Sequence, residues 1–239
     1  MRGWSALRAA GREPLAVVAA TVGLGLLLWG PEGQTLLPHA WLPENPRLAW
    51  MARFAFGAAV VVLVPALTLR LWARPTDPRE HSLAAWGFGL GDWRRGLPLA
   101  LAFALVGSLA TSLAASGDPG LRAEYPLFAP GPARAPLPLT AFASYEAAYF
   151  LFFLCGEAAM RGLLLFGLER RVGAVQAVLL TTIVQIVWHT GKPGAELATV
   201  PLWGLAAGAL NLRLRSFWWL LLAHWASNVS LDFAIHYSP

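Results

Sequence analysis

Charge and lysine are scarce in this sequence. Of its 239 residues only 13% are charged, against roughly 25% in an ordinary soluble domain. Lys192 is the single lysine, whereas tryptophan and phenylalanine each occur twelve times. Hydrophobic residues make up 57% of the chain, and the mean hydropathy is +0.54. This composition argues against a soluble enzyme, a disordered chain and a collagen-like fibre, and it favours a protein of the lipid bilayer.

Cysteine is nearly absent too. Cys155 stands alone, which excludes an internal disulfide and any metal site made of several cysteines. A thiol in an apolar helix is usually an inert packing residue, so a nucleophilic Cys155 is the weaker interpretation. The H-E-x-x-H, H-x-x-E-H, G-x-S-x-G, Walker A and G-x-G-x-x-G patterns are also missing. Their absence excludes the common zinc-protease helices and gives no support to several other frequent enzyme classes.

Long apolar runs fill most of the chain. A membrane-spanning helix needs about 20 mostly apolar residues. We find seven candidates: Pro14–Trp29, Phe54–Leu69, Leu97–Ala115, Thr140–Leu168, Val172–Trp188, Leu197–Leu212 and Phe217–Ile235. No small-x-small cleavage pattern follows the first run, so we interpret it as a retained helix rather than a signal peptide. We predict an all-α, polytopic membrane protein of about seven transmembrane helices, forming a single transmembrane domain over residues 1–239, with the site enclosed by the C-terminal helices.

The basic residues indicate the orientation of these spans. With the N-terminus inside, the inner segments hold twelve arginines and the outer segments five basic residues, as the positive-inside rule requires. The net charge of +5 therefore suits anionic lipids, and we expect no nucleic-acid partner. The arginine-rich, lysine-poor composition favours a high-GC bacterium. We expect a multi-pass protein of the bacterial inner membrane with a cytoplasmic N-terminus, and a short interfacial helix around Trp86–Leu97.

A few polar residues interrupt the apolar runs. Ionisable side chains within spans are costly, and they are candidates for functional sites. Residues four apart share one face of a helix. Three predicted helices each carry such a pair: Glu157 with Arg161, Gln185 with His189, and His224 with Asn228. A structural ion pair is a reasonable explanation of one pair, but it is the weaker explanation of three pairs on three helices.

The depths of the three pairs overlap. At about 1.5 Å per residue, Glu157 lies about 20 Å from the inner end of its helix, and the other two pairs fall at similar levels. We therefore predict one cavity in the middle-to-outer part of the membrane. Glu146 lies eleven residues before Glu157 on nearly the same face, about 16 Å away along the helix. We expect Glu146 to line the path of the substrate.

A carboxylate and two imidazoles in such a cavity suit hydrolysis. Glu157 would act as general base toward a water molecule. His189 would share that water or bind a metal, and His224 and Asn228 would donate hydrogen bonds to the tetrahedral oxyanion. Glu157, His189 and His224 could alternatively hold Zn²⁺ with an open position. The sequence leaves both versions open.

The ordered polar pairs resemble a known family. The run Gly156–Gly162 is similar to the E-E-x-x-x-R-G motif of the CPBP intramembrane proteases, which process CAAX proteins and bacteriocins. Gln185–His189 is similar to their F-x-x-x-H motif, and His224–Asn228 matches their H-x-x-x-N motif. The resemblance implies an all-helical membrane peptidase that cuts near a membrane-anchored or prenylated segment. It implies catalytic roles for five residues, Glu157, Arg161, His189, His224 and Asn228, within a core of residues 140–239, with residues 1–139 as accessory helices.

The sequence also departs from the family pattern. Gly156 stands where the family usually has its first glutamate, which is commonly given the water-activating role, and Gln185 replaces the usual phenylalanine. The run His189–Glu196 resembles a divergent branch, the myxosortases, which process C-terminal sorting signals on exported proteins. That resemblance adds Lys192 and Glu196 to the expected lining of the substrate site, in which we also expect Gln185. An ordinary turn and rim pair is an equally good explanation of Lys192 and Glu196.

We therefore expect an intramembrane peptidase whose partners are the bilayer and a membrane-anchored protein substrate. Two interpretations from other classes remain. Gly156 favours a catalytically silent family member that binds a partner or confers immunity. A proton-coupled transporter would use Glu157, His189 and His224 as a relay, although transporters commonly show two related halves and none is visible in this sequence.

Overall fold

The computed structural model describes residues 41–72, 82–128 and 137–237, and for residues 61–72 the backbone alone. The described residues are helical and contain no strand. In chain order the elements are α3 (Pro46–Trp72), η3 (Leu83–Trp86), α4 (Trp93–Gly117), α5 (Pro119–Glu124), α6 (Leu139–Glu157), η4 (Ala158–Phe166), α7 (Gly167–Val172), α8 (Ala174–Trp188), α9 (Gly194–Leu214) and α10 (Trp218–Tyr237). The all-α prediction is confirmed.

Six of the seven predicted spans coincide with these helices, and the first, Pro14–Trp29, lies outside the described residues. In the described part of the chain, three helices are long and apolar enough to cross a membrane. They are Trp93–Gly117, Leu139–Val172 and Gly194–Leu214. The second of these joins α6, η4 and α7 into one rod of 34 residues. The fold is that of a polytopic membrane protein.

The short helix before α4 differs from the sequence prediction. It is a 3-10 turn at Leu83–Trp86, closed by Gly87 in the left-handed region at φ 78°. Residues from Trp93 onward already belong to α4, because the carboxylate of Asp92 accepts a hydrogen bond from the Arg95 amide at 3.3 Å and so caps the helix there. No separate helix covers Trp86–Leu97.

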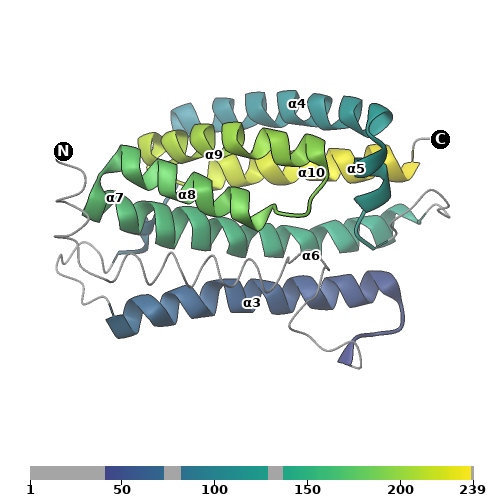
Figure 1. The fold of residues 1–239 in the computed structure, drawn as a ribbon, viewed down its shortest axis with the longest axis horizontal. Coiled ribbons are helices and arrows are strands. Elements are labelled where there is room, and N and C mark those ends of the chain that lie inside the picture. Colours follow the sequence, from purple (N-terminus) through teal and green to yellow (C-terminus); the bar gives the residue numbers. More distant parts are fainter. Residues whose placement is uncertain (1–40, 73–81, 129–136, 238–239) are drawn as a thin grey trace.

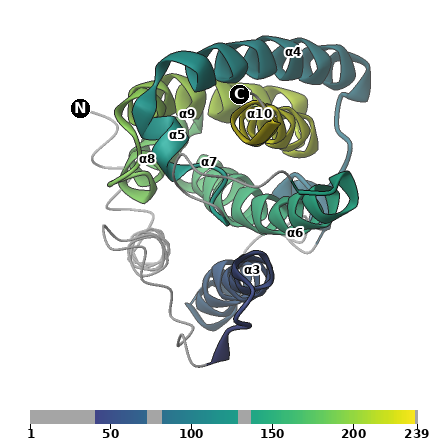
Figure 2. The ribbon, with the colours of Figure 1, turned by 90° about the vertical axis from the view of Figure 1, so that its right-hand side faces the viewer.

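The helices form a bundle with α10 in its interior. Figure 1 shows α4, α9 and α10 running side by side above α6, with α3 along the opposite side of α6. In the end-on view of Figure 2, α10 lies between α4 and α6, flanked by α9. The longest shared surfaces join α10 to α4, α3 to α6 and α8 to α9. Polar residues on α6, α8, α9 and α10 are therefore directed into the bundle.

One face of α4 is apolar and uncovered. Its outward residues recur every four positions, as one stripe of an α-helix requires: Leu97, Leu101, Leu105, Leu109 and Leu113. Each of them exposes 44–70% of its surface. A stripe of this length would be unfavourable in water, whereas hydrocarbon tails accept it. This face is consistent with contact between α4 and the lipid.

The two ends of the bundle carry different charges. At the end where α4 begins and α9 ends, the Asp92 amide donates to the Leu214 carbonyl at 2.9 Å, and Arg215 pairs with Glu169 at 2.8 Å. A Cβ on Gly91, which lies at φ 54°, would collide with that same carbonyl. This end gathers the arginines of α4, α7 and α9. The opposite end carries α5 and the turn between α8 and α9.

Candidate active site

A cavity of about 110 Å³ opens inside the bundle between α6, α8, α9 and α10. A cavity needs about 10–15 Å³ to hold one water molecule, so several fit here. All three polar pairs of the sequence contribute to its lining or lie directly behind it. The lining includes, among apolar and aromatic side chains, Gly156, Glu157, Gln185, His189, Lys192, Glu196, His224 and Asn228. The arrangement encloses polar groups within a largely apolar lining, with room for water.

Glu157 lies where α6 changes its helical form. From Ala158 to Phe166 the rod continues as a π-helix, a wider form that occurs frequently at functional sites. Arg161 lies within this wider stretch, and its side chain has no exposed surface. Its Nε donates to Oε2 of Glu157 at 3.3 Å, and its Nη2 donates to the side-chain oxygen of Gln185. Arg161 therefore lies behind the cavity wall and ties α6 to α8.

His224 is held by Glu157 from across the bundle. Its Nδ1 lies 3.1 Å from Oε1 of Glu157, and because a carboxylate only accepts, Nδ1 carries the proton. The rings of Phe153 and Trp203 lie 4.8 and 5.1 Å from the imidazole, on α6 and α9 respectively. One turn further along α10, the amide of Asn228 donates to the His224 carbonyl at 3.0 Å. Asn228 also lines the cavity, and its amide group has a second hydrogen to donate.

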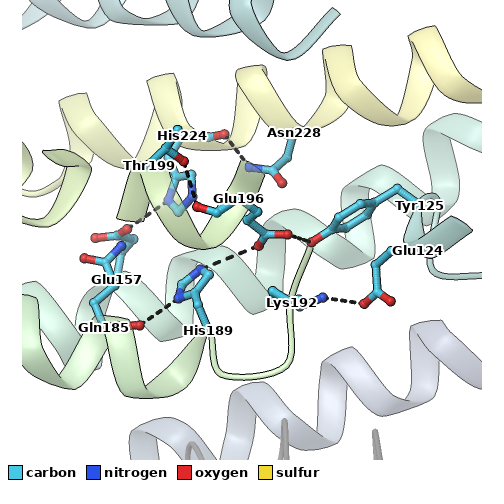
Figure 3. Close-up of polar contacts among 10 residues, drawn as sticks. All are labelled: Glu124, Tyr125, Glu157, Gln185, His189, Lys192, Glu196, Thr199, His224 and Asn228. Carbon is cyan, nitrogen blue, oxygen red and sulfur yellow. Dashed lines mark hydrogen bonds and ion pairs between the residues drawn. The ribbon is translucent and has the colours of Figure 1, made fainter. Parts of the chain in front are cut away.

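The turn from His189 to Glu196 joins α8 to α9. It reverses at Gly191, whose φ of 91° suits glycine, and Pro193 precedes the first residue of α9. His189 Nδ1 lies 2.7 Å from the Gln185 carbonyl, and its Nε2 lies 3.8 Å from Oε1 of Glu196. Burial lowers the pKa of His189 below its usual value, against the opposing charge of Glu196. The turn thus brings His189 and Glu196 to the same cavity (Figure 3).

The outer wall of the cavity comes from a segment that sequence reasoning missed. Tyr125 follows α5, is only 2% exposed, and donates its hydroxyl to Oε2 of Glu196 at 2.8 Å. Burial, reinforced by the charge of Glu196, raises the pKa of Tyr125 well above its usual value, so the hydroxyl keeps its proton. Lys192 lies 4.9 Å above the same ring and pairs with Glu124 at 2.8 Å. Figure 3 shows the hydrogen bond between Tyr125 and Glu196 and the pair of Lys192 with Glu124.

Gly156 lines the cavity and faces open space. A Cβ built at this position meets no atom within 4 Å. The position where the family usually has its first glutamate is therefore an unfilled part of the wall. Cys155, next to it in sequence, is half-buried and does not line the cavity.

Glu146 lies away from this cavity. It is 4% exposed and lies beside Asp232 on α10, which is 1% exposed. Neither residue lines the cavity. The structure places the expected site residues together with the exceptions of Arg161, which lies behind the wall, and Glu146.

The residues considered for Zn²⁺ do not form a metal site here. Glu157 contacts His224, whereas His189 faces Glu196. Within the described ranges, no three histidine, cysteine or acidic side chains are grouped closely enough to hold a metal ion. We therefore derive no step through a metal.

Comparison with known proteins points to one family. Residues 138–230 match the family described as Rce1-like, type II CAAX prenyl endopeptidase Rce1-like. This segment contains all three polar pairs, and the match supports the resemblance of the C-terminal part of the chain to the CPBP intramembrane proteases. No curated protein and no solved structure matches the chain significantly. The Rce1-like family is a protease family, which supports peptidase activity in general terms.

Proposed function

We propose that the protein is an intramembrane endopeptidase that cleaves a substrate protein near its membrane-anchored C-terminal segment. One observation carries the proposal: Glu157, His189, His224 and Asn228 come from three regions of the chain and line one small cavity inside an apolar bundle. Polar groups are expensive in that environment and mark functional sites. The Rce1-like match supports a proteolytic use of this cavity.

The residues divide into two roles in this proposal. His189 takes a proton from the attacking water through an imidazole nitrogen directed toward the cavity. Glu157 contributes negative charge and holds His224 and Arg161, so both of its oxygens are engaged. Gln185 supports the site by fixing Arg161 and by accepting the Nδ1 proton of His189.

His224 and Asn228 stabilise the oxyanion that forms when water attacks the peptide carbonyl. Asn228 offers its second amide hydrogen, and His224 donates from Nε2 when its ring is protonated beside Glu157. Removal of a donor of this kind typically lowers kcat by about 10²–10³-fold. Lys192 and Glu196 line the outer part of the cavity, where an extended substrate segment would enter.

The position of the cavity supports a proposal for the substrate class. It reaches the end of the bundle that carries α5, opposite the arginine-rich end. With the N-terminus in the cytoplasm of a bacterial cell, that end faces outward. The resemblance of His189–Glu196 to the myxosortases then favours C-terminal sorting signals of exported proteins as substrates.

The test compares exported proteins in the native host. A strain lacking the protein is complemented with the natural chain, with Glu157→Gln or with His224→Ala, and the C-termini of exported proteins are determined by mass spectrometry. We expect unprocessed precursors in the strain lacking the protein and in both variants. Cys155→Ala serves as the matched control, because this thiol neighbours the site without lining the cavity.

Two outcomes would contradict the proposal. Normal processing in both Glu157→Gln and His224→Ala would leave a silent binding protein or a transporter as the better interpretation. Loss of processing in Cys155→Ala alone would indicate a thiol mechanism.

A further inference from the structure

The first motif of this protein lacks the glutamate to which the family's water-activating role is commonly given. The family position for that group is Gly156, which has no side chain. The neighbouring Glu157 has both oxygens engaged, Oε2 with Arg161 at 3.3 Å and Oε1 with His224 at 3.1 Å. The cavity therefore needs another carboxylate if a carboxylate and His189 are to share the water.

Glu196 fills this requirement. It is the other acidic residue that lines the cavity, and it lies in the first turn of α9, where the helix dipole favours a negative charge. Tyr125 donates to its Oε2 at 2.8 Å, which leaves Oε1 directed at His189. A protonated tyrosine can only donate to this oxygen, so it holds Glu196 as an acceptor.

His189 presents a second acceptor to the same point. Because its Nδ1 lies 2.7 Å from a backbone carbonyl, which cannot donate, Nδ1 carries the hydrogen and Nε2 has a lone pair. Nε2 of His189 and Oε1 of Glu196 are 3.8 Å apart, too far for a direct hydrogen bond. Two acceptors that face each other require a donor between them.

Water satisfies both acceptors at once. A water oxygen about 2.8 Å from each acceptor atom would see them about 85° apart at this separation, a little less than the bond angle of water. Both of its hydrogens would then be donated, and its lone pairs would be directed away from the two acceptors. This is the orientation that a nucleophilic water needs.

We infer that Glu196, held by Tyr125, acts with His189 as the water-activating pair of this peptidase, in place of the glutamate that is absent at Gly156. The inference rests on the proposed function. Glu196 is a catalytic residue because it touches the reacting water, and Tyr125 is a positioning residue because it acts through Glu196.

The reaction balances with these groups alone. The water oxygen attacks the carbonyl carbon of the scissile peptide, and one water proton passes to Nε2 of His189, while Glu196 stabilises the imidazolium. The carbonyl oxygen takes the negative charge and is stabilised by Asn228 and His224. The C–N bond then breaks, the leaving nitrogen takes the proton from His189, and the products are a carboxylic acid, which ionises, and an amine.

The experiment measures processing of the precursors that accumulate in the strain lacking the protein, by pulse-chase in the native host. We expect Glu196→Gln to slow processing by about 10²-fold or more, and Tyr125→Phe to slow it less, since the carboxylate remains. Glu169→Gln is the control, because this carboxylate pairs with Arg215 at the opposite end of the bundle. All variants are checked for membrane level and thermal unfolding.

A rescue experiment separates a catalytic role from a structural one. Gly156→Glu places a carboxylate on the open part of the same cavity wall. We expect it to restore part of the processing that Glu196→Gln removes, because the lost function is a carboxylate near the water. A structural role of Glu196 in joining Tyr125 to α9 would not be restored in this way.

Three outcomes separate a failure of the proposed peptidase function from a failure of the role of Glu196. If no precursor accumulates without the protein, the proposed function fails and this inference fails with it. If His224→Ala stops processing while Glu196→Gln leaves it unchanged, the peptidase stands and the role of Glu196 is overturned. If Glu196→Gln stops processing and Gly156→Glu restores none of it in a folded protein, Glu196 is structural.

Discussion

Nδ1 of His224 on α10 lies 3.1 Å from Oε1 of Glu157 at the end of α6, while Oε2 of the same carboxylate accepts from Arg161. One carboxylate thus joins an arginine and a histidine from two helices. Its position at the start of the π-helical stretch means that the family motif has a structural use here as well as a chemical one.

Glu157→Gln is expected to destabilise the fold as well as stop processing. Arg161 has no exposed surface, and without the anion its charge would be buried with only Gln185 beside it. Breaking a buried ion pair costs about 3–5 kcal/mol. Thermal unfolding of the purified protein measures this loss. Glu169→Gln breaks an exposed pair and should change stability by less than about 1 kcal/mol. Equal effects in the two variants would contradict the buried-pair explanation.

Gly156→Ala is expected to stabilise the protein. The position lies in a helix and its Cβ would meet open space, and glycine in a helix costs roughly 0.5–1 kcal/mol relative to alanine. Gly96→Ala is the matched comparison, because its Cβ would collide with the indole ring of Trp219. That variant should lose about 1–3 kcal/mol. A lower unfolding temperature for Gly156→Ala would show that a side chain at position 156 meets other atoms in the folded protein.

Activity is expected to fall on the acid side of the usual histidine range. His189 must be neutral to accept a proton from water, and burial lowers its pKa below the ordinary 6.5. Activity should therefore persist through pH 6.5 and be lost as the pH falls further. In Glu196→Gln the charge that raises the pKa of His189 is gone. The pH at which the residual kcat/KM falls should therefore be lower than in the natural protein. If activity is already lost above pH 6.5 as the pH falls, a group other than His189 controls the loss.

Glu146→Gln is expected to leave processing close to the natural rate. Glu146 lies outside the cavity, beside Asp232. A glutamine keeps a hydrogen-bonding side chain of the same length at this position. The pulse-chase assay in the native host measures the effect. A loss of processing as large as that of Glu157→Gln would mean that the substrate path extends to the Glu146–Asp232 pair.

The long helices could be predicted from the sequence, because hydropathy and length suffice to define a membrane span. The predicted position of the short helix before α4 was wrong, because the start of α4 depends on the Asp92 cap rather than on hydropathy. The π-helical stretch was also unpredicted, since nothing in the residue pattern of Ala158–Phe166 marks a change of hydrogen-bond register.

The candidate site could be predicted where residues of one helix repeat at a spacing of four. His224 and Asn228 are an example, and their bond across one turn is local. Tyr125 could not be predicted, because its contact with Glu196 joins residues 71 positions apart and the loop that carries it has no periodic pattern. The different roles of Glu157 and Glu196 could not be predicted, because they depend on which of their carboxylate oxygens already have hydrogen-bond partners.

The size of the cavity limits the shape of the substrate. At about 110 Å³ it admits a few atoms of side chain and backbone, whereas an α-helix with its side chains is about 10–12 Å across. A peptide bond inside a membrane helix also has its carbonyl engaged in that helix. The bond to be cut must therefore belong to an extended stretch, as residues just beyond the end of a membrane anchor do. Lengthening the anchor's helix through the cleavage point should protect a substrate without changing its sequence at the cut.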